Sequence, residues 1–395
     1  MPNYENPSRL EVEAWTFTFH SHNGRVFKSA VILSCALFVL AGCGTAPRRP
    51  DKKIDAPSDW ETSPAPNPEP HLAVTNPPVP ARNPLAAPPP RQKTNGLTLN
   101  AAEATWLSLD RWAREHGLES LRQSGLALAE NYSLAGSNGV LTLRLGTLSA
   151  DWDGVEFRLG FAPQLIDGQL FVHALDLHKN LEPLLRAVAP SATMGRVIVI
   201  DPGHGGPSPG THSASDGRNE KTFTLDWALR TARMLEANGW RVFLTRTNDT
   251  DVSLADRVAC ADEHHADLFL SLHFNSFGGG THKQAGLETY CLTPVGMPSS
   301  LTRGYEDNPA QSFPNNAFDE QNFLLAVQLH RALLKTIGGA DRGVRRARFL
   351  TVLRGQNRPA VLIEGGYLSN LRESRQIGDA AYRQKLAVAV AEGLK

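Results

Sequence analysis

Three ionisable side chains stand where apolar, strand-like runs end. His204 follows VIVID in the segment DPGHGG, His273 lies in LFLSLHFNS, and Glu364 ends AVLIE. In open α/β sheets the ligand crevice lies outside the carboxyl ends of the strands, so three separate strand ends would bring these groups to one place. Two histidines and one carboxylate also match a zinc site that keeps a fourth position open for water.

A second carboxylate, Glu220, stands at the start of a predicted helix in the segment RNEK. It is available to the same site, although the helix dipole also favours an acidic residue in a first turn. The alternative role of His204, which lies among glycines, is that of a turn residue. The alternative role of His273 is that of a buried core histidine. Asp201, at the end of VIVID, is expected to orient His204 or to cap the loop rather than to bind metal.

These groups fall in a region of alternating strands and helices, residues 196–395. Continuous apolar runs, as expected of parallel strands covered on both faces, occur at Val197–Asp201, Leu268–Leu272 and Ala360–Ile363. Amphipathic or apolar helical patterns occur at 222–236, 321–337 and 382–394. The fold class is therefore predicted to be α/β, with a mostly parallel sheet flanked by helices on both faces. This arrangement resembles phosphorylase/hydrolase-like folds.

Residues 97–193 are predicted to form a small α+β module ahead of that domain. A helix is expected over 101–117, then short strands with Gly or Asn-Gly turns, including one over 164–172, and a last helix over 176–188. This pattern resembles the copper amine oxidase N-terminal-like modules attached to some bacterial wall enzymes. The module is therefore a candidate for wall binding, and no residue in it forms a catalytic constellation.

The N-terminal residues have the pattern of an exported lipoprotein. The apolar run Ser29–Leu40, preceded by Arg25 and Lys28, is too short to span a bilayer and suits the h-region of a signal peptide. It runs into LAGC, which resembles the lipobox of bacterial lipoproteins. Residues 1–42 are thus predicted to be a signal peptide, and Cys43 a lipidated residue that attaches the protein to a membrane. Because Gly44 follows, the resemblance implies the periplasmic face of the outer membrane.

Residues 43–95 are predicted to be a proline-rich linker. Of the 27 prolines in the chain, 14 lie between Pro47 and Pro90, and such a tract favours extended polyproline II and acts as a semi-rigid spacer. A proline-rich ligand for a partner domain is the alternative. The position of this tract directly behind the apolar run also disfavours a cytosolic core helix at 29–40.

Charge and cysteine content exclude several classes of protein. The chain has 40 basic and 40 acidic residues, a formal net charge of +0, which gives no electrostatic reason to expect nucleic acid as the main partner. Four cysteines in 395 residues rule out a disulfide scaffold, and no CxxC pair suggests a thiolate zinc site.

Several separated motifs resemble the zinc-dependent N-acetylmuramoyl-L-alanine amidases of peptidoglycan metabolism, amidase type 3. In order along residues 196–395 they are DPGHGG, NEK, SLHFNS, GLETYCL, DRGV and VLIEGGYLSN. Each motif alone is a weak signal, but the ordered set is specific. The resemblance implies that His204, Glu220 and His273 bind zinc and that Glu364 is the catalytic residue.

The implied reaction is hydrolysis of the amide bond between N-acetylmuramic acid and the L-alanine of the stem peptide. Zinc lowers the pKa of bound water towards about 7 and polarises the amide carbonyl. Glu364 ends a buried strand, where desolvation would raise its pKa. It would take the proton of the water and deliver it to the departing amine. Two alternatives remain: a zinc peptidase acting within the stem peptide, and a catalytically inactive wall-binding lipoprotein.

Two further features are left open by the sequence. The segment between Leu292 and Gln321 is irregular and rich in Pro and Asn. Some relatives carry an autoinhibitory helix there, for which Glu306 or Glu320 would supply the carboxylate, but a substrate-contacting loop is preferred because few residues support a helix. Glu288, within GLETYCL, either lines the cleft or is structural. An activator protein, the physiological role and the oligomeric state are not indicated.

Overall fold

The computed structural model describes residues 105–124, 130–136, 138–186, 196–277 and 283–395. The predicted signal peptide, Cys43, the linker and residues 97–104, 125–129, 137 and 187–193 of the small module lie outside these ranges. No helix within the described ranges has both the length and the apolar character needed to cross a membrane.

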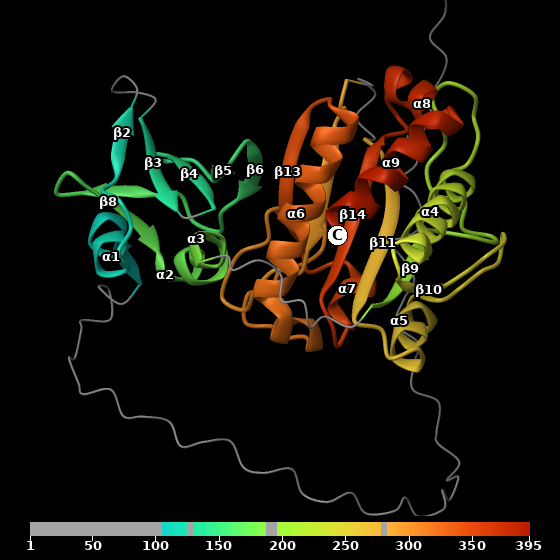
Figure 1. Ribbon diagram of the computed structural model, residues 1–395, viewed down its shortest axis with the longest axis horizontal. Helices are drawn as coiled ribbons and strands as arrows, with labels where there is room; N and C mark the ends of the chain where they lie inside the picture. The colour runs from blue at the N-terminus through green and yellow to red at the C-terminus, as the bar shows by residue number, and fades with distance from the viewer. Residues whose placement is uncertain (1–104, 125–129, 137, 187–195, 278–282) are drawn as a thin grey trace, which may run out of the picture. The chain divides into compact units, whose positions relative to one another are not determined.

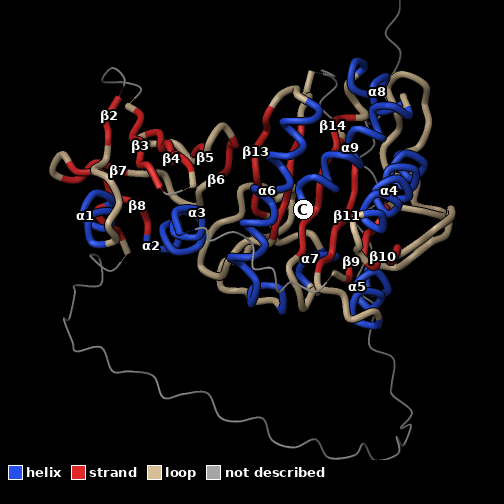
Figure 2. The backbone as a smooth tube through the Cα atoms, viewed as in Figure 1, coloured by secondary structure: helices blue, strands red, loops and turns tan. Residues whose placement is uncertain are grey.

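Within its described residues, the region from residue 196 onward contributes six neighbouring strands to one sheet, in the order β10-β9-β11-β14-β12-β13. Figures 1 and 2 label all of these strands except β12. Their bounds are β9 Val197–Pro202, β10 Arg241–Leu244, β11 Leu268–Asn275, β12 Leu287–Cys291, β13 Asp341–Arg346 and β14 Ala360–Tyr367. The strands β10, β9, β11 and β14 are parallel to one another, whereas β12 is antiparallel to β14 and parallel to β13. The predicted α/β class is confirmed, with a mixed sheet whose parallel part carries the ends of the three apolar runs.

Helices cover both faces of these strands. Their bounds are α4 Glu220–Ala237, α5 Leu254–Glu263, α6 Asp319–Ile337, α7 Thr351–Arg354, α8 Leu371–Gly378 and α9 Ala380–Gly393. Figure 1 shows α6, α9 and α4 side by side; α9 packs against both α6 and α4, and α4 and α6 pack against strands of the sheet. Successive strand residues point to opposite faces, so Ile198 and Ile200 join the core under these helices. Val199 joins the second core, beside α5 and α7.

The small module, described over 105–124, 130–136 and 138–186, contains short strands and helices. Their bounds are β1 Trp106–Ser108, α1 Leu109–Glu115, β2 Arg122–Ser124, β3 Asn131–Gly136, β4 Gly139–Arg144, β5 Ser149–Trp152, β6 Val155–Arg158, β7 Gln164–Ile166, β8 Gln169–His173, α2 Ala174–Asp176, a π-helical turn Leu177–Leu181 and α3 Glu182–Arg186. Among the described residues of the module, strands β1, β8 and β7 form a separate three-stranded sheet.

Two elements of this module differ from the expected ones. Of the helix expected over 101–117, residues 101–104 lie outside the described ranges, and the helix that the structure describes begins at Leu109, where the side chain of Ser108 accepts a hydrogen bond from Arg111 N and caps it. The expected single strand over 164–172 is the hairpin β7–β8. Its turn is formed by Asp167 and Gly168, both with positive φ, which reverses the chain between the two strands.

The antiparallel strands β2 to β6 extend the sheet of the 196–395 region. Strand β6 pairs in parallel with β13 through Phe157 and Val344. Glu156 N donates to the Asp341 carboxylate at 2.8 Å, and the buried Arg346 donates to the π-helical turn of the module. In the part of the chain that the structure describes, the two regions distinguished in the sequence therefore share one sheet of eleven strands.

Candidate metal centre

His204 lies in the loop that leaves β9. Its Nδ1 is 3.0 Å from the Ser208 hydroxyl, and its Nε2 is 3.1 Å from Oε2 of Glu220. The carbonyl of His204 accepts a hydrogen bond from Arg257. Ser208 thus holds the ring nitrogen that faces away from the site, an arrangement that fixes ring orientation in metal-binding histidines.

Asp201 fixes this loop through Arg257 and does not touch the His204 ring. Its buried carboxylate accepts hydrogen bonds from Arg257 at 2.5 Å, from Thr245 at 2.6 Å and from Ser271 at 2.8 Å. Burial alone would raise the pKa of Asp201, but the Arg257 guanidinium keeps it below its usual value. Of the two roles expected for Asp201, the geometry shows the loop-fixing one.

Glu220 is the first residue of α4, and both oxygens of its carboxylate are held. Thr211 N donates to Oε2 at 3.0 Å, and Phe274 N donates to Oε1 at 2.9 Å. Oε1 also lies 3.1 Å from Nδ1 of His273. Burial alone would raise the pKa of Glu220, but the two nearby histidines, His204 first, hold it well below its usual value. The carboxylate is therefore fixed and ionised.

Two glycines allow these side chains to come together. A Cβ added at Gly203 would lie 2.2 Å from Cε1 of His273. A Cβ at Gly210, where φ is +68°, would lie 2.6 Å from Oε2 of Glu220. Any larger residue at either position would displace a member of the group.

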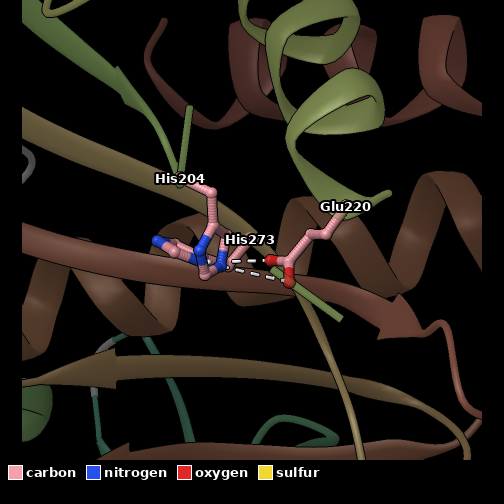
Figure 3. A group of neighbouring side chains, drawn as sticks. All are labelled: His204, Glu220 and His273. Atoms are coloured by element: carbon pink, nitrogen blue, oxygen red, sulfur yellow. Dashed lines mark hydrogen bonds and ion pairs between the residues drawn. The ribbon is translucent and has the colours of Figure 1, made fainter. Parts of the chain in front are cut away.

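The geometry of His204, Glu220 and His273 fits a single metal ion (Figure 3). One nitrogen or oxygen from each side chain lies within 4.8 Å of the others, and Figure 3 shows both imidazoles directed at the carboxylate. Two ligand atoms about 2.1 Å from one tetrahedral ion are roughly 3.4 Å apart. The two histidine–carboxylate separations of 3.1 Å are close to that value. Two imidazoles and one carboxylate are also the donor set of zinc sites that keep a position open.

Glu364 lies on β14 beside this group. It is the register partner of His273 on β11 and of Glu288 on β12. Its side chain is buried, and burial raises its pKa to about 7. Among the described residues, Oε2 of Glu364 has no hydrogen-bond partner. An acid with one free oxygen and a pKa near neutrality is suited to accept and release protons.

Glu288 has a structural role next to the candidate ligands. Its buried carboxylate accepts hydrogen bonds from Asn275 at 2.6 Å, Tyr290 at 2.7 Å, Tyr367 at 3.0 Å and Arg342 at 2.7 Å. Burial opposes ionisation, but Arg345 and Arg342 keep the pKa of Glu288 below its usual value. Asn275, two residues after His273, is thereby held in a fixed orientation.

The segment between β12 and α6 is largely irregular, with a 3-10 helix at Pro314–Phe318. Glu306 and Glu320 are both exposed, and neither belongs to the group of candidate ligands. The segment instead brings Arg303 to the site, where Nη2 donates to the side-chain oxygen of Asn275 at 2.9 Å. Sequence reasoning missed Arg303 and Ser208 because neither belongs to a periodic pattern or to a motif with known spacing.

Comparisons with known proteins concern the half of the chain that holds this centre. The sequence profile of the N-acetylmuramoyl-L-alanine amidase family matches residues 198–395. A sporulation-specific N-acetylmuramoyl-L-alanine amidase of Bacillus subtilis is 36% identical over 200 residues, covering 50% of this chain and 66% of that protein. The amidase AmiA of Escherichia coli is 33% identical over 220 residues, covering 50% of this chain and 75% of that protein.

A solved structure is also similar. The catalytic domain of CwlV, an N-acetylmuramoyl-L-alanine amidase from Bacillus (Paenibacillus) polymyxa, is 31% identical with a TM-score of 0.42. The match covers 50% of this chain and 96% of that chain.

Proposed function

Because this chain belongs to the N-acetylmuramoyl-L-alanine amidase family, we propose that it cleaves the amide bond between N-acetylmuramic acid and L-alanine with the help of a bound zinc ion. Peptidoglycan amidase activity is the function that the family match and the relatives named as amidases support. The convergence of His204, Glu220 and His273 beside the buried Glu364 is the observation that carries the zinc-dependent part of the proposal.

The candidate ligands would hold zinc through the Nε2 atom of His204, the carboxylate of Glu220 and the Nδ1 atom of His273. When bound, zinc supplies Lewis-acid polarisation of the amide carbonyl and makes water acidic enough to attack at neutral pH. The backbone donors of Thr211 and Phe274 keep the Glu220 carboxylate in place for this task. The chain therefore presents the donors already oriented.

Glu364 would carry the proton transfers. Its carboxylate takes a proton from the attacking water as the new C–O bond forms at the lactyl carbonyl carbon. The same carboxyl group then gives that proton to the alanine nitrogen as the C–N bond breaks, because an amine is a poor leaving group unless it is protonated. A pKa of about 7 suits both transfers at neutral pH. The products are a lactyl carboxylate on the sugar and a stem peptide with a free N-terminal alanine.

Digestion of purified peptidoglycan by the purified chain tests this function. Mass spectrometry should find stem peptides with a free N-terminal alanine, and a chelator should abolish their release until zinc is restored. New termini inside the stem peptide would instead support the peptidase alternative. Undiminished release by the Glu364→Gln chain or in chelator would refute the mechanism, and an inactive wild type with intact fold and zinc would favour the wall-binding alternative.

We also propose that Cys43 is lipidated and that residues 43–95 tether the enzyme to the periplasmic face of the outer membrane. The apolar run, the LAGC segment and the proline-rich tract support this proposal. Metabolic labelling with a radioactive fatty acid should mark the wild-type chain and leave Cys43→Ser unlabelled. Label of equal strength on both chains, or recovery of the wild type only in soluble fractions, would contradict it.

A further inference from the structure

Arg303 is held in an unfavourable backbone conformation at the edge of the candidate site. Tyr305 N donates to the carbonyl of Thr302 at 2.8 Å, which closes a tight turn. The two central residues, Arg303 and Gly304, have φ values of 45° and 81°. Left-handed φ is disfavoured for a residue with a Cβ, and such strain persists only where the surrounding structure maintains it, often at functional positions.

The surrounding structure does maintain this turn. The buried Arg348 donates to the Asp307 carboxylate at 2.6 Å and to the carbonyl of Pro294 at 2.7 Å. Asp307 in turn accepts hydrogen bonds from both the backbone N and the hydroxyl of Ser299 at 2.8 Å. These contacts lie on both sides of the turn, so the loop is a fixed part of the fold.

The Arg303 guanidinium lies in an acidic part of the site. It donates to Asn275, whose amide group is itself held by Glu288, and it lies 5.7 Å from the ring centroid of Phe349. Burial alone would lower the pKa of Arg303, but the nearby negative charge of Glu364 raises it above its usual value. The guanidinium is thus a positive charge held against Asn275, two residues after the candidate ligand His273.

We propose that Arg303 binds a carboxylate of the stem peptide and so determines which way the substrate lies across Glu364. The inference rests on the proposed amidase function. Arg is suited to this role because its planar fork of donors matches a carboxylate. The glycan side of the scissile bond offers no such anion, since the lactyl carboxyl group is tied up in the amide. The stem peptide carries free carboxylates, so the peptide side faces Arg303.

Two muramoyl-peptide substrates test the assignment, one with free stem-peptide carboxylates and one in which they are converted to carboxamides. The wild type should show a KM for the free form lower by about tenfold or more, as expected for a charged hydrogen-bonded pair. In Arg303→Gln the ratio of the two KM values should fall to about one, and in Arg303→Lys it should be intermediate. The control Arg354→Gln, which removes a guanidinium stacked over Phe313, should keep the wild-type ratio.

Binding of the released stem peptide, free or amidated, provides a readout that needs no turnover. Calorimetry should show the same loss of preference in Arg303→Gln, with thermal unfolding confirming that the variant is folded. An unchanged ratio in Arg303→Gln, or no preference in the wild type, would overturn the proposal and leave Arg303 as a charge partner of Glu364. Failure of every chain to cleave the amide would refute the proposed function instead, and peptide binding would still decide the role of Arg303.

Discussion

His273 and Glu364 are register partners on the adjacent parallel strands β11 and β14. Paired residues on neighbouring strands project from the same face of a sheet, so the candidate ligand and the candidate general base are neighbours through backbone pairing alone. Glu288 continues the same row on β12. The base is thereby placed by the sheet, which positions catalytic groups more accurately than loops do.

Glu364→Gln should abolish proton transfer without disturbing the metal ligands. We expect kcat to fall by about 10²- to 10⁴-fold, the usual contribution of general acid–base catalysis. Zinc content, measured by elemental analysis of the purified protein, should equal that of the wild type. Loss of zinc from this variant would show that Glu364 is a ligand rather than the base.

The same substitution should change how stability depends on pH in the chelated protein. The ordinary pKa of Glu364 is 4.5, and burial raises it to about 7 in the folded state. Between these values the unfolded chain has released the proton and the folded chain has not, so wild-type stability falls as the pH rises. Gln cannot ionise, so the unfolding temperature of Glu364→Gln should exceed that of the wild type by an amount that grows across this window. A difference independent of pH would contradict the buried placement of the carboxyl group.

Ser208→Ala should weaken zinc binding by about 10- to 100-fold, as is usual when the partner of a ligand histidine is removed. The hydroxyl of Ser208 contacts Nδ1 of His204, and without it the ring can turn away from the site. Competition with a chelator measures the affinity. Ser215→Ala is a matched control on the same loop, because its hydroxyl contacts Ser213 and not a ligand. Equal weakening by both changes would mean that the loop as a whole, rather than the Ser208 contact, sets the affinity.

The positions of the strand-end groups could be predicted because their strands are buried on both faces. Strands β9, β11 and β14 are nearly continuous apolar runs for that reason, and the point where each run ends is visible in the sequence. The start of α4 was equally visible from its amphipathic pattern, although its residues begin at Glu220 rather than 222.

Strand β13 could not be predicted in this way, because its sequence DRGVRR has no apolar periodicity. Its formation depends on distant partners: β12 and β6 pair with it, and Arg346 donates to the carbonyl of Leu292 and to Asn180. The position of Arg303 depends in the same way on contacts made far along the chain. Such contacts between residues far apart in the chain cannot be predicted from the local sequence.

Glu288→Gln should destabilise the protein by about 2–4 kcal/mol, because it removes the charge at the centre of a buried hydrogen-bond network that includes Arg342. The folded-state pKa of Glu288 is below its ordinary value of 4.5, so the wild-type advantage is present above that pH and is lost as the pH falls below it. Urea unfolding at about pH 7 and about pH 3.5 measures both effects. Glu306→Gln, at an exposed position, is the control and should change stability little. A wild-type advantage as large at the lower pH as at about pH 7 would contradict the network.

Phe157→Ala tests whether the two regions of the chain unfold together. Phe157 is fully buried, its backbone pairs with Val344 on β13, and its ring lies 5.4 Å from that of Phe323 on α6. Truncation should lower the free energy of unfolding by about 3–5 kcal/mol. Because the sheet is continuous through β6 and β13, the loss should lower the stability of the metal centre as well. The urea midpoints measured by circular dichroism and by zinc release should therefore fall together in Phe157→Ala. The control Val140→Ala, at a position on β4 where the side chain is 43% exposed, should shift neither midpoint. If zinc release kept its wild-type midpoint in Phe157→Ala, the junction between β6 and β13 would not couple the module to the metal centre.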